Sequence, residues 1–335
     1  MRNETRSAFN AFMQTLASLN GVPSASAKFA VSPSIQQKLE SRIQESSDFL
    51  QRINLVGVTE QQGEKLGLGI GGPIASRTNT DASDRATSDP TSLDGIGYTC
   101  KQTNYDTHIS YSKLDAWAKF PDFQTRIRDL IVRRMALDRI MIGFNGTSAA
   151  AATNKATNPL LQDVNIGWIQ QYKTNSPARV LTGGATAGQV KVGATGDYKT
   201  LDALVYDTVN NLVDPWYRED TALVCLLSRD LLADKYFPLV NNANLAPSEQ
   251  MAADLVISQK RVGGLQAVRV PFIPNNTIMV TTLDNLSIYY QDGARRRTVV
   301  DNAKRDRVEN YESSNDAYVV EDYGRGCVIT NIAQV

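Results

Sequence analysis

Histidine and cysteine are scarce in this chain of 335 residues, and their scarcity excludes several kinds of site. His108 is the single histidine, so one chain cannot build a zinc site with two histidine ligands. The three cysteines, Cys100, Cys225 and Cys327, lie about a hundred residues apart and form no CxxC zinc or redox motif. Such a small, odd set favours a reducing compartment, with each thiol serving as a small buried hydrophobe.

Neither an excess of one charge nor a long apolar run is present. Lysine plus arginine and aspartate plus glutamate number 35 each, which argues against a dedicated DNA-binding protein. No segment approaches the ~20 apolar residues of a membrane span, and the first twenty residues lack the apolar core of a signal peptide. Apolar residues make up 42% and charged residues 21% of the chain, so we expect a folded, cytoplasmically made protein of one or two domains.

Motifs for catalysis or nucleotide binding are also missing. The run GLGIGG at Gly67–Gly72 is followed by Pro73 and a polar loop, whereas a dinucleotide site requires a helix at that point. No nucleophile elbow (G-x-S-x-G) accompanies His108. Scattered carboxylates could still meet in a fold, so a cytosolic α/β enzyme with a deep polar pocket stays open as an alternative.

The first 49 residues predict two short helices joined by a small-residue linker. Phe9, Phe12 and Leu16 recur at helical spacing before Asn20-Gly21 ends the pattern, and a second helix is predicted over Ser34–Phe49. These helices could form a hairpin docked on the body of the protein. They could equally form an arm that reaches a neighbouring chain.

The next segment predicts a long β-hairpin. Strands are expected over Ile53–Thr59 and Lys65–Ile70, joined by a turn through Gln62-Gly63, and alternation resumes over Tyr98–Tyr111. Between them, Ser76–Gly97 forms a polar tract of 22 residues, and loops of this length are normally functional or disordered. The strands carry too few apolar residues for a core, so we expect a projecting hairpin that a neighbouring subunit covers.

A long amphipathic helix is predicted over Asp122–Phe144, with Leu130, Ile140 and other apolar residues on one stripe. Its basic residues lie off that stripe: Arg126, Arg128, Arg133, Arg134 and Arg139. They form either a solvated face with ion pairs or a basic face set against acidic neighbours or DNA phosphates. A second basic cluster, Arg295–Arg297, similarly fits an inter-subunit strip better than nucleic-acid readout.

The remaining chain predicts an α+β protein with an α/β-like middle portion. Helices are expected near Asp163–Tyr172, over Leu201–Leu212, and from Ser228 to a stop at Pro238. The strands expected in the second half complete a β-rich end: Ala222–Leu227, Ala267–Val270, Thr277–Thr282, Leu286–Tyr290, Thr298–Val300, Val308–Tyr311, Ala317–Tyr323 and Cys327–Ile332.

Several long segments resemble the major capsid protein of P2-type tailed bacteriophages. They are QESSDFLQRINLVGV (Gln44–Val58), LDAWAKFPDFQTRIRDLIVRRMALDRIMIGFNG (Leu114–Gly146), NPLLQDVNIGWIQQYK (Asn158–Lys173), LLADKYFPLVN (Leu231–Asn241) and DRVENYESSNDAYVVEDY (Asp306–Tyr323). The resemblance extends over nearly the whole chain and is weakest in loops such as Ser76–Gly97 and Thr182–Thr195.

This resemblance implies the Hong Kong 97-type capsid fold. The implied domains are an N-terminal arm at 1–49, an extended hairpin (E-loop) at 50–111, a peripheral domain at 112–200 with a spine helix at 122–144, an axial domain at 201–271, and a β-rich return to the peripheral domain at 272–335. The helices and strands predicted above from the residues alone agree with this division.

The resemblance also implies a function as a structural protein rather than an enzyme, without cofactor or metal. In that family the subunits form pentamers and hexamers that close into an icosahedral shell around double-stranded DNA in the virion. The implied partners are an internal scaffolding protein or prohead protease, a portal protein and packaged DNA, with assembly in the bacterial cytoplasm and no membrane. The protease would trim the arm near Lys28, Phe29, Ala30 and Val31.

Arg126, Arg133, Arg134, Arg295, Arg296 and Arg297 are then candidates for inter-subunit or DNA-facing contacts. The shell hypothesis predicts a subunit that is clearly less compact than a globular chain, with large flat surfaces. An enzyme would instead show a deep pocket, and a nucleic-acid-binding module would show one strongly basic face.

Overall fold

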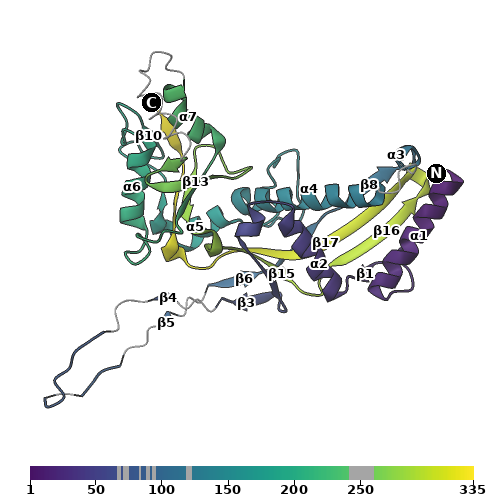
Figure 1. Ribbon diagram of the computed structural model, residues 1–335, viewed down its shortest axis with the longest axis horizontal. Helices are drawn as coiled ribbons and strands as arrows, with labels where there is room; N and C mark the ends of the chain where they lie inside the picture. The colour runs from purple at the N-terminus through teal and green to yellow at the C-terminus, as the bar shows by residue number, and fades with distance from the viewer. Residues whose placement is uncertain are drawn as a thin grey trace.

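The computed structural model describes residues 1–65, 69–70, 75–82, 84–87, 91–92, 96–117, 123–240 and 260–335. The molecule is elongated, with a long sheet and helix at one end, a second sheet with its helices at the other, and a hairpin that projects from the middle (Figure 1). The solvent-accessible surface is 18839 Å². A compact monomer of this length would expose about 13,500 Å², so the expectation of a non-compact subunit is confirmed.

A seven-stranded sheet forms the larger end of the molecule. Its order is β1-β16-β17-β15-β2, and β7 and β8 also pair with β17. The strands are β1 (Phe29–Ala30), β2 (Asn54–Val58), β7 (Lys101–Asn104), β8 (Thr107–Ser110), β15 (Leu286–Gln291), β16 (Arg296–Asn302) and β17 (Arg307–Val320). The central strand β17 is continuous, so the prediction of two separate strands, Val308–Tyr311 and Ala317–Tyr323, was wrong.

The helix predicted over Asp122–Phe144 is confirmed as α4 (Phe123–Asn145). Its buried stripe includes Val132, Met135 and Ile140, whereas Leu130 is 70% exposed and does not belong to the stripe as predicted. The shorter helix α5 (Trp168–Asn175) packs against α4, and it begins five residues after the predicted start at Asp163.

A close approach at Gly143 joins these two helices. A Cβ atom at Gly143 would lie 2.3 Å from Cζ3 of Trp168, so only glycine leaves room for the indole ring. Trp168 is fully buried, and its Nε1 donates a hydrogen bond of 3.1 Å to the carbonyl oxygen of Ser287. Phe144, Phe49 and Tyr318 surround the indole with ring centroids 5.2–6.2 Å away.

A six-stranded sheet forms the other end, in the order β12-β13-β11-β14-β18-β9. Its strands are β9 (Val180–Leu181), β11 (Val224–Leu227), β12 (Arg261–Val262), β13 (Leu265–Arg269), β14 (Ile278–Thr281) and β18 (Cys327–Ile329), and beside it β10 (Val190–Val192) pairs with β19 (Ile332–Gln334). Helix α6 (Leu201–Leu212) has the bounds that its periodicity predicts. Helix α7 (Arg229–Val240) continues past Pro238, so the predicted stop there was wrong.

The projecting hairpin is built differently from the prediction. Strand β2 pairs in parallel with β15 inside the seven-stranded sheet, so it is not hairpin-paired with the next strand. Gln62 and Gly63 lie within β3 (Gln62–Glu64), which pairs with β6 (Gly97–Thr99), so the predicted turn through these residues was wrong. Further out, β4 (Gly69–Ile70) pairs with β5 (Thr91–Ser92). Parts of the GLGIGG run and of the polar tract lie outside the described residues.

The amino-terminal helices are docked on the body of the same chain. Helix α1 (Asn3–Asn20) packs Leu16 and Ala17 against Phe29, Val31 and Val299, and it lies beside β16 and β1 (Figure 1). Helix α2 (Pro33–Glu45) is four residues shorter than predicted at its C-terminal end and packs against α4. Of the two predicted alternatives, the structure shows the amino-terminal helices docked on their own chain rather than extended toward a neighbour. Helix α3 (Tyr111–Trp117) follows β8.

Candidate assembly surfaces

The segment that the resemblance marks for trimming is an edge strand in this structure. Phe29 and Ala30 form β1 and pair with Arg297 and Arg296 of β16. The pairing is extended because the N–H of Val31 donates to the carbonyl of Arg295 at 2.9 Å. Phe29 and Val31 are buried, whereas Lys28 and Ala30 are exposed.

Helix α1 is fixed to the sheet by a polar contact as well as by apolar packing. Arg6 forms an ion pair with Asp301 of β16, and the hydroxyl of Tyr111 donates to the same carboxylate. Burial raises the pKa of Asp301, but the hydrogen bonds from Tyr111 and Arg6 outweigh burial and hold the pKa below its ordinary value. The contact is therefore present over the range in which Asp301 is ionised.

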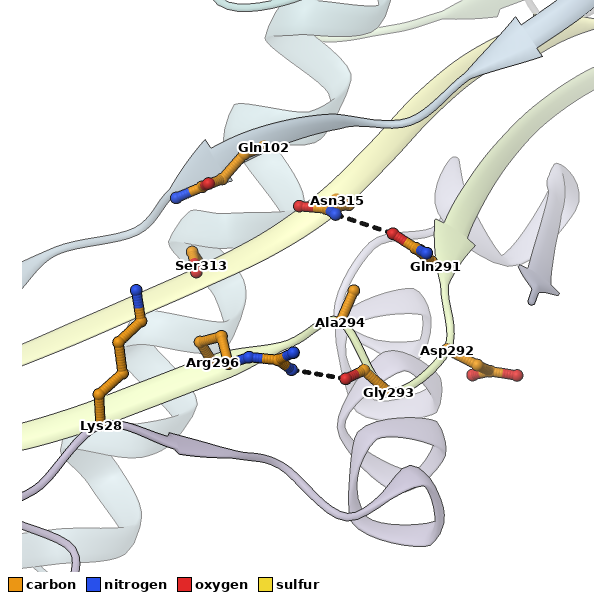
Figure 2. A pocket seen from close by; sticks show the side chains of 9 residues that line it. All are labelled: Lys28, Gln102, Gln291, Asp292, Gly293, Ala294, Arg296, Ser313 and Asn315. Carbon is orange, nitrogen blue, oxygen red and sulfur yellow. Dashed lines mark hydrogen bonds between the residues drawn. The ribbon is translucent and has the colours of Figure 1, made fainter. Parts of the chain in front are cut away.

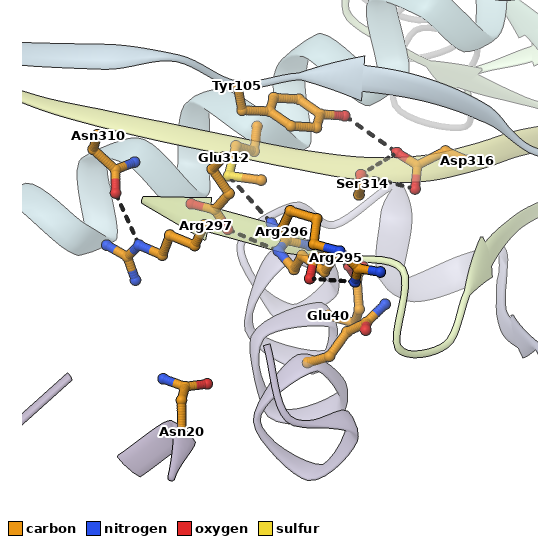
Figure 3. A network of polar contacts seen from close by, with 12 residues as sticks. Asn20, Glu40, Tyr105, Arg295, Arg296, Arg297, Asn310, Glu312, Ser314 and Asp316 are labelled. Atoms are coloured by element: carbon orange, nitrogen blue, oxygen red, sulfur yellow. Dashed lines mark hydrogen bonds and ion pairs between the residues drawn. The ribbon is translucent and has the colours of Figure 1, made fainter. Parts of the chain in front are cut away.

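A buried ionic cluster joins the second arm helix, the long helix and the sheet. Glu40 of α2 accepts hydrogen bonds from Arg139 of α4 at 3.1 Å and from Arg295 at 2.6 Å. Arg295 also donates to Glu312 at 2.7 Å, and Arg139 lies 3.2 Å from Asp316. Figure 3 shows Arg295 between Glu40 and Glu312, with Asp316 nearby on β17.

The pKa values of two carboxylates in the cluster are shifted in opposite directions from their ordinary values. Burial opposes ionisation of Glu312, but the charges of Arg295 and Arg297 outweigh burial and lower its pKa. Burial is the larger effect at Asp316 and raises its pKa, against the opposing charge of Arg139. Three carboxylates facing two guanidinium groups favour this outcome, because only some of the negative charge can be balanced.

Two predictions made from the sequence were wrong for residues of this cluster. Arg295 was a candidate for inter-subunit or DNA contact, but it is fully buried and paired inside its own subunit. Arg139 was placed off the apolar stripe, on either a solvated face or a basic face set against acidic neighbours or DNA phosphates, but it is fully buried and pairs with Glu40 and Asp316 of its own chain. Neither residue can face a partner in this conformation.

The other basic candidates lie at or near the surface. Arg126, Arg133 and Arg134 are exposed on α4, and Arg134 forms an ion pair with Asp138 at 2.8 Å. Arg297 is half-buried and its Nε donates to Asn310 at 2.8 Å. Arg296 is also half-buried and donates to the carbonyl oxygen of Gly293.

The base of the hairpin is anchored by a buried lysine. The Nζ of Lys65 donates to the carbonyl oxygen of Glu321 at 2.7 Å and to that of Val320, and it lies 4.6 Å from the centroid of the Tyr323 ring. Tyr98 of β6 packs edge-on against Tyr289 of β15, with the centroids 5.0 Å apart. The root of the hairpin is thus fixed to the seven-stranded sheet.

Two open cavities lie on the surface of the described part of the chain, and the walls of the first are mostly polar. One of 390 Å³ lies between the amino-terminal segment and the sheet, and one of 330 Å³ lies near the C-terminal end of α4. Figure 2 shows the first, with Lys28 and Arg296 along its wall. Among the described residues, no group of His, Cys, Asp and Glu could hold a metal ion, and no helix is long and apolar enough to cross a membrane.

Two exposed aromatic residues and one buried acid were not predicted to be important from the sequence. Tyr206 on α6 is 65% exposed and Trp216 in the following loop is 48% exposed, and large exposed aromatic residues are typical of contact surfaces. Glu40 also went unnoticed, although a lone acid on the inner side of an amphipathic helix is a signal for a buried partner.

The elongated α+β subunit with a docked arm, a projecting hairpin, a long helix and a separate end sheet has the Hong Kong 97-type fold of phage capsid proteins. Among solved structures, the chain superimposes on a subunit of the satellite phage P4 procapsid, solved with its size determination protein, with a TM-score of 0.83 and 48% identity over 100% of this chain and 99% of that one. The capsid subunit of an empty GTA particle shares the fold, with a TM-score of 0.51 at 17% identity over 86% and 90% of the two chains.

The chain belongs to the P2 family of phage major capsid proteins, whose family model matches residues 8–332. It is 50% identical to the capsid protein of Escherichia phage P2, over 99% of this chain and 95% of that protein. It is 43% identical to the major capsid protein of Serratia phage KSP20, over 99% and 97% of the two. The chain is therefore a structural protein of the phage capsid and a component of the virion.

Proposed function

We propose that this subunit assembles as pentamers and hexamers that close into an icosahedral shell around double-stranded DNA. The observation that carries the proposal is the hairpin, whose root is fixed to the sheet and whose described outer residues extend away from the body (Figure 1). Its described outer residues, 75–82 and 84–87, are almost all exposed. A neighbouring subunit would supply the surface that this hairpin lacks in its own chain.

The end sheet would form the axial domain at the capsomer centre. Its predicted range, 201–271, contributes α6, α7, β11, β12 and β13, and strands β9, β14 and β18 complete the sheet from outside that range. The seven-stranded sheet and α4 would form the peripheral domain, with the E-loop between β2 and β7. Tyr206 and Trp216 would then lie on surfaces available to neighbouring subunits.

An internal scaffolding protein with protease activity would direct assembly and trim the arm between Lys28 and Val31. In this subunit those residues form an edge strand with Phe29 and Val31 buried. Because a protease binds its substrate as an accessible extended segment, β1 must leave β16 before cleavage. Trimming would therefore follow a local detachment of residues 1–31.

The exposed arginines of α4 would contact a neighbouring subunit or the packaged DNA without sequence specificity. Arg126, Arg133 and Arg134 lie on the exposed side of a helix whose opposite side is buried. Net charge zero limits repulsion among the many copies in a shell. A portal protein would occupy one vertex, and assembly would take place in the cytoplasm of the bacterial host.

Electron microscopy of the overexpressed chain, with and without a co-expressed scaffold, tests this proposal. Closed shells or capsomer rings are expected, and mass spectrometry of protein from co-expressed shells should show a new amino terminus within Lys28–Val31. A chain that stays monodisperse and monomeric in both conditions would contradict shell assembly. The matched variant replaces residues 66–95 with a short glycine-serine turn, and it should fold but fail to close shells.

A further inference from the structure

The cavity of 390 Å³ in Figure 2 has walls from two different parts of the chain. Lys28 comes from the amino-terminal segment, whereas Arg296, Ser313 and Asn315 come from β16 and β17. The cavity is open to solvent and its walls are almost entirely polar. It therefore presents side chains suited to hydrogen bonding and charge pairing rather than to apolar packing.

The polar groups of this cavity are only partly satisfied. Arg296 Nη1 donates to the carbonyl oxygens of Gly293 and Arg295, and Asn315 Nδ2 donates to Oε1 of Gln291 at 2.8 Å. The part of the chain that the structure describes provides no hydrogen-bond or ion-pair partner for the Lys28 ammonium. In Figure 2 that side chain extends toward Ser313.

The charge of the lining selects the kind of ligand. Lys28 and Arg296 contribute two positive charges, and Asp292, which points away from them in Figure 2, contributes one negative charge. The resulting excess of one positive charge matches a monoanionic carboxylate better than a dianionic phosphate. An arginine and a lysine beside hydroxyl and amide donors form charge-assisted hydrogen bonds with a carboxylate.

We propose that this cavity binds the side-chain carboxylate of an acidic segment from a second copy of this chain. Either Asp81 or Asp84 can supply this single carboxylate, because both are exposed on the outer hairpin. The inference rests on the proposed function in one respect, which is that two copies must meet. It adds a receptor site for the outer hairpin and two residues that determine its specificity.

A consequence follows from the position of Lys28. One of the two cations belongs to the segment whose trimming is proposed, so a bound carboxylate holds that segment against β16. Cleavage after Lys28 would remove half of the positive charge of the site. The carboxylate would then be released or held by Arg296 alone.

Fluorescence anisotropy of a labelled peptide with the sequence of residues 79–84, NTDASD, tests the site on the full-length chain at low ionic strength. Lys28→Gln and Arg296→Gln should each weaken binding by at least about tenfold, the loss expected for one charge-assisted hydrogen bond. Lys38→Gln, which removes an exposed lysine of α2, should bind as the unmodified chain does. The peptide NTNASN should not bind.

Three outcomes would overturn the inference: equal binding by Lys28→Gln and Lys38→Gln, equal binding of the two peptides, or tighter binding of inorganic phosphate than of NTDASD. A charge exchange in whole shells provides a second readout. Arg296→Glu should impair closure, and adding Asp81→Arg and Asp84→Arg should restore it. If unmodified chains form shells but the exchange restores nothing, this inference fails while the proposed function stands.

Discussion

Glu40 is a buried carboxylate that two buried arginines share. Its carboxylate lies between Arg139 and Arg295, which are both fully buried. The three side chains come from α2, from α4 and from the chain just before β16. One acid thus joins α2 to the long helix and the sheet.

Glu40→Gln should lower the free energy of unfolding by about 3–5 kcal/mol, because it leaves two buried guanidinium groups undercompensated. Urea denaturation of the full-length chain measures the change. Glu45→Gln, an exposed position on the same helix, should stay within about 0.5 kcal/mol of the unmodified chain. Equal effects at the two positions would contradict the role given to the cluster.

Glu312 should make the subunit sensitive to acid. Its pKa is lowered in the folded chain, so its contribution to stability is present above the ordinary glutamate value of 4.5 and is lost as pH falls through the folded pKa. Asp316 has a raised pKa and acts in the opposite sense, with its contribution lost as pH rises. Asp316 is present in both the unmodified chain and Glu312→Gln, so the difference between their unfolding free energies measures the effect of Glu312.

Glu312→Gln should therefore be less stable than the unmodified chain at pH 7, and the two should converge as pH falls below the ordinary glutamate value of 4.5 and through the lowered pKa of the folded chain. Denaturation midpoints measured across this range provide the comparison. A constant difference at all pH values would show that Glu312 acts through packing or hydrogen bonding alone.

Sequence reasoning failed at these residues for a physical reason. Arg139 and Arg295 have the composition of surface residues, and their partner Glu40 lies 99 and 255 positions away. No local pattern contains such a pair. The exposed arginines Arg126, Arg133 and Arg134 could be placed correctly, because helical periodicity alone separates them from the buried stripe.

At the scale of elements, predictions from local sequence patterns were correct where the element is held by contacts within one segment. Helix α6 was predicted to the residue because its apolar stripe lies within one segment, and the structure adds an N-cap in which the Thr200 hydroxyl accepts from the N–H of Ala203. Strand β17 was split in two because Ser314 and Asp316 look like loop residues, although they are buried in the ionic cluster. The turn predicted at Gln62-Gly63 failed because β2 pairs with β15, more than two hundred positions away.

Gly143→Ala should separate α4 from α5. The added methyl group would overlap the Trp168 ring, so we expect a loss of about 1–3 kcal/mol in the free energy of unfolding. A double-mutant cycle with Trp168→Leu supplies the control, since a smaller side chain makes room for the methyl group. Additive effects in that cycle would show that the two positions do not interact.

At the scale of the whole molecule, the α+β class and the order of many elements along the chain could be predicted from the sequence, whereas the placement of these elements in space could not. The two amino-terminal helices and the long helix α4 follow one another along the chain in the predicted order. Their assembly depends on pairings such as β1 with β16 and β14 with β18, which connect distant segments. Only the folded structure shows that the arm covers its own sheet.

Small-angle X-ray scattering at low concentration should give a radius of gyration above the roughly 20 Å of a globular chain of this length. The expected excess comes from the elongated body and the projecting hairpin. The variant with residues 66–95 replaced by a short turn should show a smaller radius. A value near 20 Å for the unmodified chain would contradict a hairpin that stands away from the body.

The short strand β1 protects an edge of the seven-stranded sheet before the subunit assembles. An uncovered strand edge invites pairing with any other chain, which leads to aggregation. Phe29 and Ala30 pair with β16 and so cover that edge in the free subunit, which should limit non-specific strand pairing between newly made chains. The proposed trimming would then expose the edge of β16 only inside a particle in which neighbouring chains already surround it.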